Sequence, residues 1–139
     1  MISEQRVILF QVRDNSAKIS KIIETATLHF ERKEKMVFFV DDGKALQYLD
    51  ELLWKTPPSS FLPHVAIDMP CSDYLVLTTT KQSLNEAKIG FNLCATPLLL
   101  DGLKILYDFE DLTTSSKQTL STNRFNAYKL KRYAIEARP

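Results

Sequence analysis

The chain has 139 residues, of which 45% are hydrophobic and 25% charged, and its formal net charge is +1. This composition is typical of one globular domain, and the small net charge excludes a global field that would steer the chain onto nucleic acid. The longest apolar runs, Met36–Val40 and Pro97–Leu100, fall far short of the ~20 residues of a membrane span, so we expect no membrane partner. Cys71 and Cys94 form no CxxC pair, which favours free thiols in a reducing cytoplasm.

The sequence also lacks the usual motifs of cofactor sites. Its three glycines, Gly43, Gly90 and Gly102, assemble neither GxGxxG nor a P-loop, so we expect no nucleotide site. Its two histidines, His29 and His64, give no metal-ligand spacing with the cysteines. We therefore expect no metal, no cofactor and no catalytic residue.

The first half of the chain reads as strand, helix, strand, helix. Residues 6–12 (RVILFQV) form an apolar strand, and the run Asp14-Asn15-Ser16 offers caps for a helix that continues to Phe30. Residues 35–41 (KMVFFVD) hold five consecutive apolar residues, which indicates a strand buried on both faces. A second helix is expected over residues 44–54. This alternation predicts parallel strand pairing with right-handed crossovers.

The second half supplies three further strands and a last helix. Strands are expected at 74–79, 89–93 and 103–109, and the helix runs from Thr113 to about Tyr133, with a cap in the Thr113–Ser116 run. We predict one α/β domain over residues 1–139, with a mostly parallel five-stranded sheet and helices on both faces.

Residues 48–64 contain a feature that we call the aromatic corner. A helix ends in Trp54, Pro57-Pro58 stiffen the following turn, and Phe61, Leu62 and Pro63 are expected at the surface. Aromatic side chains on a rigid exposed turn are typical of a protein-docking surface. The alternative is that Trp54 and Phe61 plug the bottom of the core.

Two polar features at turns admit catalytic interpretations. Asp41-Asp42 follows a strand, where a phosphotransfer enzyme holds Mg²⁺; the preferred alternative is one capping and one solvated carboxylate, because no third carboxylate completes a site. His64 has no nearby carboxylate in sequence to orient it, so a structural, hydrogen-bonded histidine is preferred to an acid or base.

The stretch from Leu112 to Ile135 carries five basic residues and no acidic one. Thr122, Phe125 and Asn126 share one helical face with Lys129. A basic helix with interleaved aromatics suits an acidic peptide or a nucleic-acid backbone. The alternative is a solvated basic face.

Two segments of the chain resemble a known family. The sequence LDELLW, a Pro-containing turn and SFLPH are similar to the most recognisable segment of the chi subunit of bacterial DNA polymerase III. The segment RFNAYKLKRY resembles that family's closing helix, with its Arg-aromatic-x-x-Tyr pattern. The specific likeness covers residues 48–64 and 124–133, whereas 65–110 match only in the pattern of elements.

The resemblance implies a Rossmann-like domain that binds no nucleotide and catalyses nothing. It implies an accessory subunit that tethers the clamp-loader and polymerase assembly to single-stranded-DNA-binding protein, with mainly indirect contact to nucleic acid. The family grips the acidic C-terminal tail of that protein and docks clamp-loader components or a psi-like subunit.

The resemblance matches Trp54 and Phe61 to the aromatics of the family's psi-docking surface and Phe125 to the aromatic of its tail pocket. We add Leu62 and Pro63 to the docking set. The tail-binding set is completed by Thr122 and Asn126, and by Arg124, Lys129 and Arg132 as substitute cations. The best-known members of the family carry basic residues at the positions of Thr122 and Asn126, so tail binding is expected to be weaker here. The rival functions are a small Mg²⁺-dependent or nucleotide-dependent enzyme using Asp41-Asp42, and a direct nucleic-acid binder using the last helix.

Overall fold

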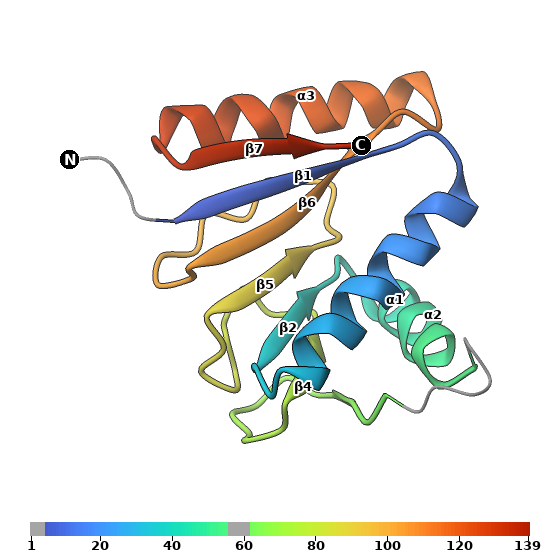
Figure 1. The fold of residues 1–139 in the computed structure, drawn as a ribbon, viewed down its shortest axis with the longest axis vertical. Helices are drawn as coiled ribbons and strands as arrows, with labels where there is room; N and C mark the ends of the chain where they lie inside the picture. Colours follow the sequence, from blue (N-terminus) through green and yellow to red (C-terminus); the bar gives the residue numbers. More distant parts are fainter. Residues whose placement is uncertain (1–4, 56–61) are drawn as a thin grey trace.

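The structure is a computed structural model that describes residues 5–55 and 62–139. Its elements, all but β3 labelled in Figure 1, follow one another in the order β1 (Arg6–Val12), α1 (Asn15–Glu31), β2 (Met36–Phe39), α2 (Gly43–Lys55), β3 (Val65–Ala66), β4 (Leu75–Thr78), β5 (Ile89–Asn92), β6 (Ile105–Asp111), α3 (Ser115–Leu130) and β7 (Ala134–Arg138). No helix in these two ranges is both long enough and apolar enough to cross a bilayer.

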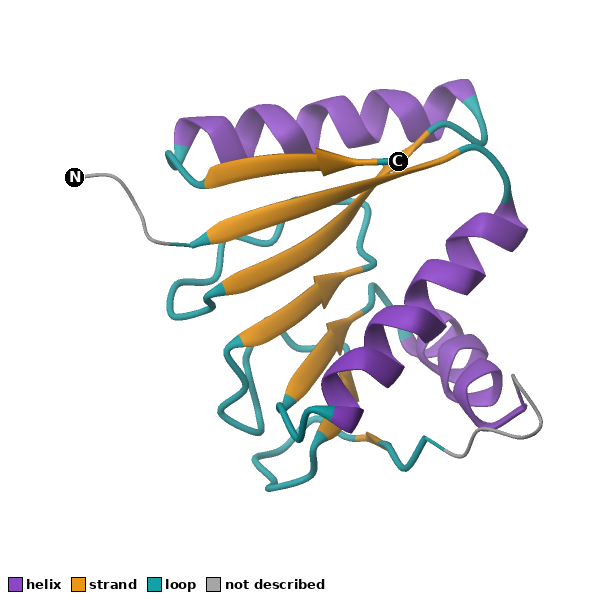
Figure 2. Ribbon diagram, viewed as in Figure 1, coloured by secondary structure: helices purple, strands orange, loops and turns teal. Residues whose placement is uncertain are grey.

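All strand pairs are parallel, in the order β3-β4-β2-β5-β6-β1-β7 (Figure 2). Strand β1 pairs with β6 and β7, so β5 and β6 lie between β1 and β2. Helix α1 therefore carries the chain from β1 to β2, past the positions that β6 and β5 later occupy. The chain then adds β3 and β4 on the far side of β2, and returns to place β5 and β6 between β2 and β1. That reversal leaves a crevice where the carboxyl ends of β2 and β5 adjoin.

The prediction of five strands is wrong, because the sheet of the described residues has seven. The missed strand β3 has only two residues, too few to carry a periodic pattern. The missed strand β7 holds one apolar residue larger than alanine, Ile135, and lies at an edge, so it lacks the apolar run of a central strand. The five strands that were predicted all exist, within two residues of the expected bounds.

Helices cover both faces of the sheet, as predicted. Side chains of β1 alternate between two cores: Ile8 and Phe10 pack in the cluster under α1 and α2, whereas Val7 and Leu9 pack in the cluster that Tyr128 of α3 enters. Figure 1 shows α3 beside β7, away from α1 and α2. The second core also receives the connections around β5.

Side-chain caps fix where the helices begin. Asp14 Oδ1 accepts the N–H of Ala17 at 2.7 Å at the start of α1, and Thr114 Oγ1 accepts that of Lys117 at 3.1 Å at the start of α3. Both caps lie in the runs expected from the sequence. The last helix ends at Leu130 rather than near Tyr133, because the chain turns through Arg132, whose φ is +61°, and enters β7.

Candidate partner-binding surfaces

The aromatic corner is described in part. Trp54, on the last turn of α2, is 44% exposed, and Pro63 is exposed as well. The prediction that Leu62 lies at the surface is wrong: it is 2% exposed and joins the core under α1 and α2, because this apolar side chain points back toward the sheet. Phe61 and Pro57-Pro58 lie outside the described residues. The exposure of Trp54 argues against its role as a core plug.

His64 is a structural histidine, as preferred from the sequence. Its Nδ1 lies 2.7 Å from the Leu62 carbonyl oxygen, and its Nε2 lies 2.8 Å from Asp50 Oδ1. Both ring nitrogens therefore have an oxygen partner within hydrogen-bond distance. The orienting carboxylate, on α2, was missed because it lies fourteen positions earlier in the chain. The imidazole also packs on the Trp54 indole, with ring centroids 4.3 Å apart.

The carboxylates of Asp41 and Asp42 both accept hydrogen bonds from backbone N–H groups. Asp42 Oδ1 accepts the Ala45 N–H at 2.9 Å and caps α2, as the preferred interpretation held. Asp41, although exposed, also accepts the Ala95 N–H at 2.9 Å, so it ties the connection after β5 to the end of β2. Within 5–55 and 62–139, no group of three or more His, Cys, Asp or Glu side chains is placed to hold a metal ion.

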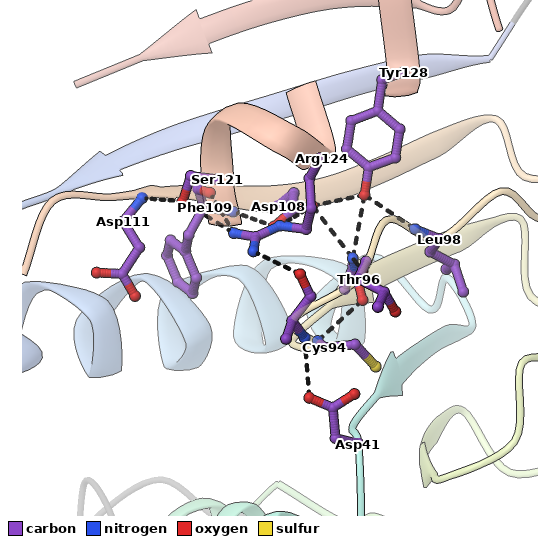
Figure 3. A network of polar contacts seen from close by, with 12 residues as sticks. Asp41, Cys94, Thr96, Leu98, Asp108, Phe109, Asp111, Ser121, Arg124 and Tyr128 are labelled. Atoms are coloured by element: carbon purple, nitrogen blue, oxygen red, sulfur yellow. Dashed lines mark hydrogen bonds and ion pairs between the residues drawn. The ribbon is translucent and has the colours of Figure 1, made fainter. Parts of the chain in front are cut away.

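The most connected side chain of α3 points into the protein. Arg124 is 6% exposed, and its Nε lies 3.2 Å from both carboxylate oxygens of Asp108. Its two other nitrogens donate to the carbonyl oxygens of Ala95 and Phe109 and to the hydroxyl of Ser121. Figure 3 shows this guanidinium between β6 and the loop after β5. Arg124 therefore joins α3 to two other parts of the fold instead of presenting a free charge.

Tyr128 completes the same buried network one turn later. Its hydroxyl donates to Asp108 Oδ2 at 2.6 Å and accepts the N–H of Leu98 at 3.2 Å. Burial and the neighbouring Asp108 carboxylate raise the pKa of Tyr128, so the hydroxyl keeps its proton. Burial likewise raises the pKa of Asp108, against the opposing effects of Arg124 and Tyr128. One sequence signal could have indicated this network, namely an aspartate inside the apolar strand ILYDFED.

A small pocket of about 220 Å³ lies between α3 and the strands β1 and β6. Thr122 and Phe125 line it together with Leu9 and Glu110. Lys129 places its ammonium 5.3 Å from the centre of the Phe125 ring. The structure thus brings together three of the six residues that the sequence assigned to tail binding.

The other three residues lie elsewhere. Arg124 is buried in the network above, and Asn126 is exposed on α3 but does not line the pocket. Arg132 follows the end of the helix, in the turn before β7. The positive charges next to the pocket are consequently fewer than the sequence suggested, and Glu110 adds a carboxylate to its wall.

The family model described as DNA polymerase III chi subunit, HolC, matches residues 5–136. The match includes every element from β1 to α3 and most of β7. No curated protein matches the sequence closely enough to count as a relative.

Proposed function

Because the chain belongs to the DNA polymerase III chi subunit family, which has an accessory role in replication, we propose that it tethers the replication assembly to single-stranded-DNA-binding protein without catalysing a reaction. The single observation that carries this proposal is the family match over residues 5–136. Tethering needs two separate surfaces and no chemistry, since linking two sites raises their effective concentration.

The first surface is the pocket on α3. Phe125 and Leu9 offer apolar contact to the last side chain of an acidic tail, and the ammonium of Lys129 next to the ring attracts its carboxylates. Exposed charges of this kind contribute about 1 kcal/mol or less each. With Arg124 engaged by Asp108 and a carboxylate of Glu110 in the wall, we expect micromolar or weaker binding, about −8 kcal/mol at best.

The second surface is the aromatic corner. Trp54 is exposed at the end of α2, and His64, held by Asp50, lies against its indole. A large, partly exposed aromatic side chain that packs against a neighbouring ring has the character of an interface anchor. We propose that clamp-loader components, or a psi-like subunit, dock here, where Pro63 is exposed as well.

The tail site is tested by titrating the full chain with a synthetic peptide of the tail. We expect binding that weakens with added salt, falls at least fivefold in Phe125→Ala, and falls less in Lys129→Ala. Leu130→Ala is the matched control, because Leu130 is 86% exposed on the same helix and does not line the pocket. A peptide lacking its terminal apolar residue should not bind. Absence of binding by the wild-type chain at low salt would refute the tail site.

A further inference from the structure

A further groove lies between α1 and α2, apart from both surfaces discussed so far. It encloses about 550 Å³, against about 220 Å³ for the Phe125 pocket. It opens where the carboxyl ends of β2 and β5 adjoin, with Val40 and Leu93 in its wall. Crevices at this position of a parallel sheet, where the strand order reverses, are the usual ligand sites of α/β folds.

The floor and sides of the groove are apolar. α1 contributes Ile19 and Ile22, and α2 contributes Tyr48, Leu49 and Leu52. Tyr48 is 60% exposed, so a large aromatic ring stands at the margin of the groove without cover from the described chain. A groove of this volume falls in the size range of ligand pockets and can take apolar side chains of an extended or helical peptide.

The charge at the mouth of the groove is positive. Three lysines line it, namely Lys18, Lys44 and Lys117, and the one carboxylate in its lining belongs to Asp42, which caps α2. Lys18 is paired with Asp111 at 2.7 Å, but neither Lys44 nor Lys117 forms an ion pair with any residue of the described ranges.

A second, more polar pocket of about 280 Å³ continues the groove and shares Lys18, Leu93 and Lys117 with it. Each carboxylate that lines this pocket already has a partner. Asp111 forms an ion pair with Lys18, Asp108 forms one with Arg124, and Asp41 accepts a hydrogen bond from the Ala95 N–H. Within the described chain, the cations left without an ion pair along the whole crevice are Lys44 and Lys117.

From this combination we infer that the α1–α2 groove is a further protein-binding surface, whose occupant is an acidic peptide segment carrying a bulky apolar side chain. The apolar side chain lies between Ile19 and Leu52 under the ring of Tyr48, and the acidic residues of the peptide meet Lys44 and Lys117. The charge complementarity selects an acidic partner over a basic one. This surface is additional to the tail pocket and the aromatic corner, and it does not depend on either.

The probe is a fluorescein-labelled peptide, Glu-Asp-Leu-Phe-Asp-Glu, titrated against the full chain and followed by fluorescence anisotropy. We expect saturable binding that weakens with salt. Tyr48→Ala should weaken it by about tenfold, and Lys44→Glu with Lys117→Glu by roughly threefold or more each at low salt. Lys88→Glu serves as the matched control, because Lys88 is exposed and lines neither the groove nor the pocket that continues it. Two control peptides, one with Gly-Ser in place of Leu-Phe and one with lysines in place of the acids, should bind poorly.

The position of the site is decided by comparing Tyr48→Ala with Phe125→Ala. Loss of probe binding in Tyr48→Ala but not in Phe125→Ala supports the groove. Loss in Phe125→Ala alone assigns the probe to the α3 pocket and overturns the inference, while leaving the proposed tail site intact. No binding of the probe at low salt, or equal binding of the Gly-Ser and lysine peptides, also overturns it. Circular dichroism of each variant checks that the fold is retained.

Discussion

Arg124 and Asp108 form a buried ion pair in which the guanidinium Nε lies 3.2 Å from both carboxylate oxygens. The pair joins α3 to the middle of β6, and each partner is almost without solvent contact. A buried charge that loses its partner is strongly destabilising, whereas an apolar replacement of both partners is often tolerated.

Arg124→Met is therefore expected to lower the free energy of unfolding by about 3–5 kcal/mol. The double variant Arg124→Met/Asp108→Leu should be destabilised less than the sum of the two single variants, because no uncompensated charge remains. Urea denaturation measures both quantities. If Arg124→Met unfolds at the wild-type urea concentration but loses tail binding, Arg124 acts at the surface and our assignment of it to the interior is wrong.

The local pattern of apolar and polar residues in the sequence was sufficient to predict most elements of the fold. Strand β1 occupies the expected residues 6–12, because a regular apolar run of seven residues has few alternatives. Strand β7 was not found, because an edge strand carries little hydrophobic signal, and the basic residues before it continued the pattern of the helix. The C-terminal stop of α3 depends on a left-handed residue, Arg132, that is neither glycine nor asparagine.

The candidate sites were harder to predict than the elements. Arg124 and Lys129 look alike in sequence, but one is enclosed by the loop after β5 and the other faces solvent. That difference depends on residues such as Asp108 and Ala95, which only the tertiary structure brings to α3. The contact between His64 and Asp50 likewise depends on the tertiary structure, because the chain after α2 folds back so that His64 reaches a carboxylate on that helix.

Trp54→Ala is expected to weaken binding of purified clamp-loader complex by ~2 kcal/mol or more, as loss of an interface aromatic does. Because Trp54 is 44% exposed, its removal should change the melting temperature little. Leu53→Ala is the contrasting variant: Leu53 is fully buried, so its truncation should cost about 2–5 kcal/mol of stability. If Trp54→Ala shows a large fall in melting temperature and unchanged binding, Trp54 is a core residue and the docking proposal for it is wrong.

Asp111 should make stability depend on pH at the acidic end. Burial works to raise its pKa, but hydrogen bonds from Lys18 and Thr113 outweigh that effect and lower the pKa to about 2, from an ordinary value of 3.8. A carboxyl with a lowered folded-state pKa stabilises the fold above its unfolded-state pKa, and the contribution is lost as pH falls from about 4 towards 2.

The measurement for Asp111 is the difference in free energy of unfolding between wild type and Asp111→Asn at a series of pH values. The difference should be constant from pH 7 to about 5 and should shrink between about 4 and 2. Taking the difference cancels the titration of the other carboxyls. A difference that stays constant down to pH 2 would show that Asp111 has no lowered pKa in the folded state.

The last prediction uses Trp54 as its own reporter, since it is the only tryptophan of the chain. The centre of the His64 ring lies 4.3 Å from the centre of an indole ring, and its two nitrogens face a carbonyl oxygen and a carboxylate oxygen. The imidazole therefore covers part of the indole. We expect the tryptophan emission of His64→Gln to shift to longer wavelength than that of wild type, because the indole meets more water, and we expect a loss of about 1–3 kcal/mol of stability from the broken hydrogen bonds.

His29→Gln is the matched control, because His29 is a buried histidine that contacts Tyr107 and Glu34. It should lose stability without a change in emission. Equal emission from wild type and His64→Gln would show that the histidine does not support the exposed face of the aromatic corner.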